Sequence, residues 1–276
     1  MERPAVAGRI GGISTNVNSS IDILILKVLI APAFVGLVSL IALRYGHRVA
    51  GWLVALPITT GTVLLVLTLT EGTTFASSAA LGALLGVVST CVFALGYARA
   101  APRYPWAVCL GVAATGFAVS TLLLSRVPEQ VLVDLIGTVF ALCIVLVVLP
   151  MPGGFAKVTS LPRWEIPVRM LTAAVIVLTI TTAAANLGSQ LSGLLSPIPV
   201  FTLTLVIFTH SREGPSPVFV FLRGLLYGLF SFAAFCAVVA VLLVPYGVGI
   251  AFTAGLGALL GVYGVVRLVL RRIPER

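Results

Sequence analysis

The sequence predicts an all-α, polytopic membrane protein built from two related copies of one helical unit. Three observations predict this fold class: an apolar composition, nine long apolar windows and an internal repeat. Of the 276 residues, 59% are hydrophobic and only 9% are charged, and the mean hydropathy is +1.17. A soluble domain of this length needs far more charge to cover its surface. The composition therefore places the chain in a membrane.

The apolar windows recur along the whole chain. A membrane-spanning helix needs about 20 consecutive, mainly apolar residues. The nine expected spans are Ile23–Leu43, Gly51–Leu69, Phe75–Tyr97, Trp106–Leu124, Val131–Leu149, Pro167–Ala185, Gln190–Thr209, Val218–Val244 and Gly247–Leu270. The eighth window is long, so we expect a tilted or bent helix there.

The chain repeats itself with an offset of 142 residues and without a gap. Matches of Leu, Ala and Val arise by chance in so apolar a sequence, so the repeat rests on Gly, Pro and Glu. Lys27 also matches Arg169, which preserves the charge. The matching pairs include Gly51 and Gly193, Pro57 and Pro199, Thr60 and Thr202, Thr62 and Thr204, Glu71 and Glu213, Gly72 and Gly214, Gly82 and Gly224, Gly86 and Gly228, and Ser89 and Ser231.

Positive charges predict the orientation. Arg and Lys gather after the first, third, fifth, seventh and ninth windows, whereas only Arg126 follows the fourth. With alternating helices these cations share one side, which the positive-inside rule makes cytoplasmic. The N-terminus is then outside, with Arg3 and Arg9, and the C-terminus is cytoplasmic.

This orientation makes the two copies inverted. We expect a disordered tail (residues 1–22) without the apolar core of a signal peptide, a first repeat (23–125), a connecting helix and loop (126–166), a second repeat (167–270) and a C-terminal tail (271–276). One unpaired helix between the copies gives a pseudo-two-fold axis in the membrane plane, as in many secondary transporters. The alternative is that duplication only enlarged a helical bundle.

Prolines interrupt one helix in each copy, and each proline frees a backbone carbonyl. In lipid, the freed groups have to face protein, water or ligand. A polar cavity and a kink satisfied by neighbouring helices both fit this pattern. Arg223 lies more than a turn into the eighth window and adds positive charge at the cytoplasmic side. The candidate substrate-binding residues are Pro57, Thr60, Thr62, Pro197, Pro199, Thr202 and Arg223.

Charges within or beside the bilayer are costly and are usually paired or functional. The repeat places Lys27 with Glu71 near the outer face and Arg169 with Glu213 near the inner face. We expect two symmetry-related ion pairs that act as alternating gates. The alternative is that the cations reach to lipid headgroups while the carboxylates face solvent.

Other patterns indicate packing and not chemistry. Gly82 with Gly86 and Gly224 with Gly228 have the four-residue spacing that lets helix backbones approach each other. The four cysteines lie inside apolar runs without metal-ligand spacing. The sequence contains neither a nucleotide-binding loop nor a His-Glu-x-x-His motif. We therefore expect no enzyme activity, catalytic residue, cofactor or metal.

The second copy contains the segment Ser192-Gly193-Leu194-Leu195-Ser196-Pro197-Ile198-Pro199-Val200-Phe201, followed by His210, Gly214 and Arg223-Gly224. This segment resembles the GlpM-type family of small bacterial inner-membrane proteins. The first copy departs from this pattern, since it has one proline and Thr68 replaces the histidine. The resemblance implies a double-length relative of single-repeat proteins, a bacterial inner-membrane location and a link to exopolysaccharide production.

Together these features predict a permease that moves a small or lipid-linked solute by alternating access. The scarcity of charge in the middle of the spans favours a neutral, singly anionic or amphipathic solute. The alternative is a non-transporting subunit of an envelope-polysaccharide or lipid-modifying assembly. The expected partners are membrane lipids and the solute, with no nucleic acid; the small-residue faces also allow a homo-oligomer.

Overall fold

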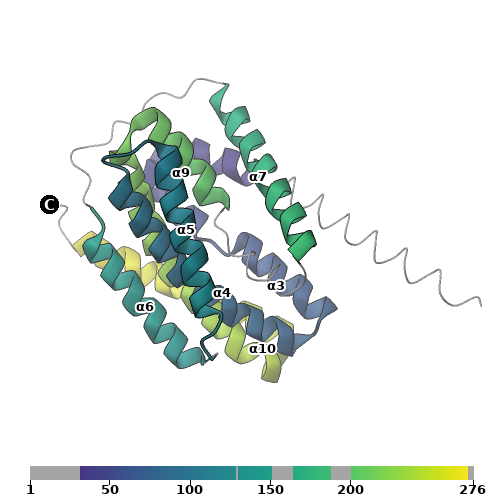
Figure 1. The fold of residues 1–276 in the computed structure, drawn as a ribbon. Helices are drawn as coiled ribbons and strands as arrows, with labels where there is room; N and C mark the ends of the chain where they lie inside the picture. The colour runs from purple at the N-terminus through teal and green to yellow at the C-terminus, as the bar shows by residue number, and fades with distance from the viewer. Residues whose placement is uncertain (1–31, 129, 151–163, 188–199, 273–276) are drawn as a thin grey trace, which may run out of the picture.

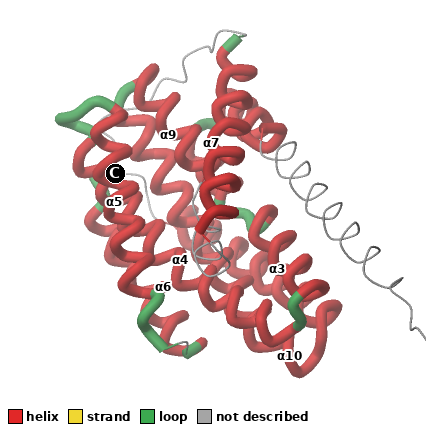
Figure 2. Tube along the Cα trace, turned by 45° about the vertical axis from the view of Figure 1, so that its right-hand side comes forward, coloured by secondary structure: helices red, strands yellow, loops and turns green. Residues whose placement is uncertain are grey.

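The computed structural model describes residues 32–128, 130–150, 164–187 and 200–272. These residues are predominantly helical, and Figure 2 draws no strand among them. The helices form one bundle, with α6 along the left edge of Figure 1 and α7 at its upper right. The helices are a first one over Pro32–Tyr45, then α2 (His47–Val54), α3 (Ile58–Thr70), α4 (Thr73–Ala100), α5 (Trp106–Leu124), α6 (Val131–Val148), α7 (Glu165–Leu187), α9 (Val200–Glu213) and α10 (Pro215–Arg272).

The eighth and ninth expected spans run together as α10, which is 58 residues long. Inside it, Gly247 has a φ of +76°, a conformation that a helix excludes and that glycine adopts readily. The Phe252 ring lies 6.1 Å from the Phe235 ring, so the chain folds back after Gly247. The helix α10 therefore consists of a first arm (residues 215–246) and a second arm (residues 248–272) that pack against each other.

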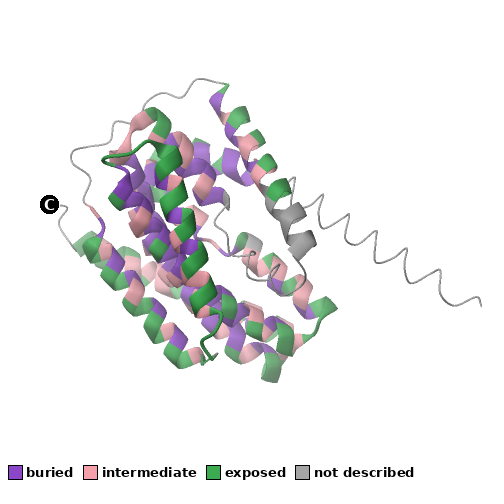
Figure 3. Ribbon diagram, in the orientation of Figure 1, coloured by how far each residue is buried: buried purple, intermediate pink, exposed green. Residues whose placement is uncertain are grey.

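The outer surface of the bundle is apolar. Among the described residues, four helices, α4, α5, α6 and α10, are long and apolar enough to cross a membrane. Exposed residues line the outer faces of α5 and α6 (Figure 3), and on α6 these include Phe140, 66% exposed, and Val147, 84% exposed. Continuous apolar faces of this kind suit lipid and not water. The chain is therefore an all-α membrane protein, whereas the count of nine spans stays a prediction.

The helix boundaries follow the offset of 142 residues. Subtracting 142 from Glu213, the last residue of α9, gives 71, and α3 ends one residue earlier, at Thr70. The next residues in the two copies are Gly72 and Gly214, with φ values of +94° and +82°. Both glycines make the same turn into the next helix, α4 or α10, in a conformation that strains any residue with a Cβ.

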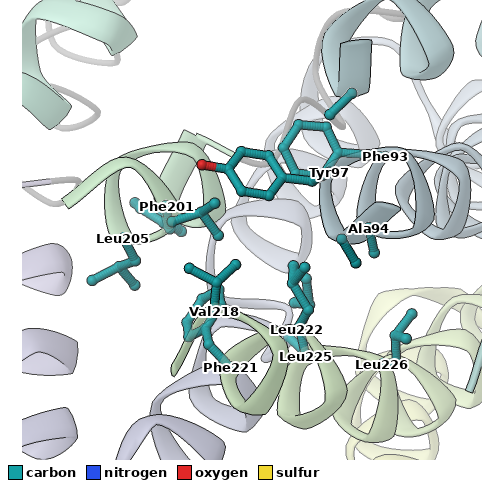
Figure 4. Close-up of a cluster of buried hydrophobic side chains, with 14 of the residues drawn as sticks. Phe93, Ala94, Tyr97, Phe201, Leu205, Val218, Phe221, Leu222, Leu225 and Leu226 are labelled. Carbon is teal, nitrogen blue, oxygen red and sulfur yellow. The ribbon is translucent and has the colours of Figure 1, made fainter. Parts of the chain in front are cut away.

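The helix α4 and its counterpart, the first arm of α10, run antiparallel. Near the start of α4, the Ser77 hydroxyl donates to the Ala240 carbonyl near the end of the first arm, at 2.7 Å. Near the end of α4, Ala94 shares a buried cluster with Leu222 near the start of the first arm (Figure 4). The unrepeated helix α6 packs against both of them.

Glycines let α2 and the first arm of α10 touch backbone to backbone. A Cβ at Gly224 would overlap the Arg48 carbonyl oxygen, and a Cβ at Gly51 would overlap the Phe221 carbonyl oxygen. At Gly228 it would meet the α2 backbone as well. The packing interpretation of Gly224 and Gly228 is thus confirmed.

Candidate functional site

The second expected span is broken in two at Pro57. The helix α2 ends at Val54 and α3 begins at Ile58, with Pro57 buried between them. The Leu56 N–H donates to the Leu53 carbonyl at 3.1 Å, which closes α2. The backbone thus leaves the helical path inside the bundle, because proline has no N–H to continue it. We refer to residues 55–57 as the α2–α3 break.

The first arm of α10 covers this break. The position of a Cβ on Gly228 lies against the Ala55 side chain and the Trp52 backbone. On α3, a Cβ added at Gly61 would lie 3.7 Å from the Phe235 ring. The break therefore faces the stretch of α10 between Gly228 and Phe235.

The candidate threonines differ in burial. Thr62 is exposed among the described residues, and its hydroxyl donates to the Ile58 carbonyl of its own helix at 2.7 Å. Thr60 is half-buried. Thr202 on α9 is fully buried, and its hydroxyl has no hydrogen-bond partner among the described residues. Two further candidates, Pro197 and Pro199, lie outside the described residues.

A buried ion pair lies at the start of α7. The Arg169 Nη2 lies 2.7 Å from the Glu165 Oε1, one turn earlier, and both side chains are at most 2% exposed. The Arg169 guanidinium also lies over the Phe208 ring of α9, at 5.3 Å. The second oxygen of Glu165 has no hydrogen bond to a described residue, and the Arg212 Nε lies 3.8 Å from it. This arrangement fixes α7 to the end of α9.

A second buried pair joins α2 to α9. The His47 Nε2 lies 3.0 Å from the Glu213 Oε2, and the side chains are 7% and 5% exposed. The expected pair of Arg169 with Glu213 is therefore wrong, because each has a different partner. In the other expected pair, Glu71 is exposed and Lys27 lies outside the described residues.

Arg223 and His210 lie at the same end of the bundle. Arg223 donates from its Nη1 to the Leu149 carbonyl at 3.1 Å, which satisfies a carbonyl at the C-terminal end of α6. Its expected role in binding solute stays a prediction. The His210 Nδ1 lies 3.0 Å from the Tyr97 hydroxyl. Burial lowers the pKa of His210, which follows the seventh expected span.

Comparison of the chain with models of known families, with curated proteins and with solved structures gives no match. The resemblance to the GlpM-type family therefore stays a prediction.

Three residues of this region were not expected from the sequence. Glu165 and His47 lie outside the repeat matches, although the spacing of Glu165 and Arg169 by four residues is a helix-pair signal. Trp52 has a buried Nε1 without a hydrogen-bond partner among the described residues.

Proposed function

We propose that the protein is a membrane transporter that moves a small or lipid-linked solute, neutral or singly anionic, by alternating access. The observation that carries this proposal is the α2–α3 break inside an apolar bundle. Transporters commonly place their solutes at broken helices, where backbone groups are free to bind. Simple packing does not require a helix to stop in the middle of the membrane.

The proposal includes two inverted copies within nine spans. It is supported by helix boundaries that follow the repeat offset and by the antiparallel course of α4 and the first arm of α10. In the orientation that we expect from the cations, the ends of α4 and α9 lie on the cytoplasmic side of a bacterial inner membrane.

The buried ion pairs supply a contact that would close the bundle at its expected cytoplasmic end. His47 with Glu213 ties α2, and so the broken helix, to α9. The Glu165–Arg169 pair lies next to this contact and orders the start of α7. Opening toward the cytoplasm would separate α2 from α9, and the His47–Glu213 contact sets the free energy of that step.

Cysteine accessibility tests the proposal. Single cysteines replace Thr60 or Thr202 in a protein from which the four native cysteines are removed, and small membrane-impermeant reagents are added from either side. We expect labelling of Thr202→Cys from both sides, because a fully buried residue reacts only when the bundle opens. Ala113→Cys, buried between α4 and α5, is the matched control and stays unlabelled.

Absence of labelling at both threonine positions would mean a bundle without a solute path. That result would overturn the transport proposal in favour of a non-transporting subunit. Faster labelling from the cytoplasmic side in the Glu213→Gln variant would identify the His47–Glu213 pair as the closing contact.

A further inference from the structure

Ser231 occupies the middle of the first arm of α10. It is equidistant in sequence from Pro215 and Gly247, about 24 Å along the helix from each at 1.5 Å per residue. The side chain is 4% exposed, and its hydroxyl has no hydrogen-bond partner among the described residues. A buried hydroxyl without a partner is costly and needs an explanation.

Ser231 lies on the side of α10 that faces the α2–α3 break. It is one helical turn from Gly228, which contacts Trp52 and Ala55, and one turn from Phe235, which approaches Gly61. Residues three and four apart share one face of a helix. Ser231 therefore lies on the face of α10 that covers the break, midway along the first arm.

A second unsatisfied donor belongs to the same region. The Nε1 of Trp52 is buried and has no hydrogen-bond partner among the described residues. Its backbone lies against Gly228, and its ring meets the Tyr263 ring edge-on, with centroids 4.6 Å apart. Tyr263 belongs to the second arm of α10, so three segments of the chain meet around Trp52.

The repeat explains why Ser231 lacks a partner. Its counterpart in the first copy, Ser89, accepts a hydrogen bond from the Thr121 hydroxyl at 2.9 Å. The offset of 142 places Tyr263 at the position of Thr121. The Tyr263 ring packs on Trp52 and does not supply the hydroxyl that Thr121 supplies in the first copy. The two copies thus differ here, because the Ser89–Thr121 hydrogen bond has no equivalent at Ser231 among the described residues.

We propose that Ser231 and Trp52 bind an uncharged solute group through a hydrogen-bond acceptor, such as a carbonyl or hydroxyl oxygen, beside the α2–α3 break. The indole N–H only donates, and the serine hydroxyl donates or accepts. Residues 52–61, 228–235 and 252–263 contain no charged side chain. A buried anion would lack a counter-charge, so the site takes a neutral solute whose apolar part packs on the aromatic rings. This inference rests on the proposed transport function and narrows its solute class.

Reagent charge tests the inference directly. Ser231→Cys is prepared in the cysteine-free protein and treated with N-ethylmaleimide, which is uncharged and carries two carbonyl oxygens. Parallel samples receive an anionic and a cationic methanethiosulfonate of similar size. We expect N-ethylmaleimide to label and the two charged reagents to fail. Ser89→Cys is the matched control, since its position is buried and hydrogen-bonded in the first copy, and we expect no labelling there.

Trp52→Phe supplies a second measurement. Phenylalanine retains an aromatic ring but removes the N–H, and one hydrogen bond to a carbonyl changes binding by at most about tenfold. We expect slower labelling of Ser231→Cys by N-ethylmaleimide in this background, by a factor within that limit. Trp164→Phe, far along the chain at the start of α7, should leave the rate unchanged. An unchanged rate in Trp52→Phe would remove Trp52 from the site.

The outcomes separate this inference from the transport proposal. If Thr60→Cys and Thr202→Cys react from both sides while Ser231→Cys does not, transport stands and the Ser231 site is wrong. If the charged reagents label Ser231→Cys as fast as N-ethylmaleimide, selection for an uncharged group is wrong. If none of the three positions reacts, both proposals fail.

Discussion

His47 and Glu213 are 166 positions apart in the chain, yet the His47 Nε2 lies 3.0 Å from the Glu213 Oε2 in a buried contact. The contact joins the half of the broken helix before Pro57 to the end of α9. It also places residues from the two sequence copies side by side, so the copies form one core and not two separate bundles.

Removal of Glu213 should destabilise the protein. In Glu213→Ala the buried His47 loses its partner, at a cost of about 1–3 kcal/mol. Thermal unfolding in detergent, followed by circular dichroism, measures the change. The control is Glu71→Ala, its exposed counterpart in the first copy, for which we expect a change within about 0.5 kcal/mol. Equal losses in the two variants would contradict the buried contact.

Glu165→Gln should destabilise the protein more strongly than Glu213→Ala. Arg169 is fully buried, and the substitution leaves its charge without a carboxylate, which costs about 3–5 kcal/mol. The same unfolding measurement applies. Arg212 is 45% exposed, so Arg212→Gln should change stability by less than about 1 kcal/mol. A larger effect of Arg212→Gln would show that Arg212 is the main partner of Glu165.

Alanine substitution should have opposite effects on stability at the two matched glycines, Gly82 and Gly224. In Gly224→Ala the new methyl overlaps the α2 backbone, and overpacking of this kind costs about 1–3 kcal/mol or more. In Gly82→Ala the methyl meets no described atom within 4 Å, and alanine favours the helix by up to about 1 kcal/mol. Thermal unfolding of both variants checks the difference. Destabilisation by Gly82→Ala as large as by Gly224→Ala would contradict the packing.

His210 should make stability depend on pH. Burial lowers its pKa below the usual 6.5, so the unfolded chain binds the proton more readily. The contribution of His210 is then complete above pH 6.5 and is lost as the pH falls through its lowered pKa. The stability difference between the unmodified protein and His210→Gln, which removes the titration, should shrink between pH 7.5 and pH 5. A constant difference over this range would show that His210 titrates normally.

Most of the correct predictions came from the chemistry of single residues and their neighbours in the sequence. Proline lacks an N–H, so Pro57 predicted a broken helix, and the structure ends α2 just before it. The match of Gly72 with Gly214 supported the repeat, and the structure gives both glycines a positive φ at equivalent turns. These features depend on single residues and their neighbours, which is why sequence spacing was enough to find them.

Expectations that required knowledge of which helix face is buried were less successful. Thr62, a candidate to line a cavity, is exposed among the described residues, and its role there stays a prediction. In a soluble helix, an apolar stripe marks the buried face, but helices in lipid are apolar all round and give no such signal. Arg169 was expected to meet Glu213, whereas Glu165, one turn earlier on the same helix, satisfies it.

The sequence by itself determined the environment, the helical class and the offset of the repeat, because these follow from composition, length and spacing. Only the tertiary structure decided the partners of the buried charges and the position of Ser231 beside the break. The His47–Glu213 contact joins residues 166 positions apart, and glycines let α2 approach α10 so closely that the break lies against Gly228. Long-range packing of this kind has no signature within either segment alone.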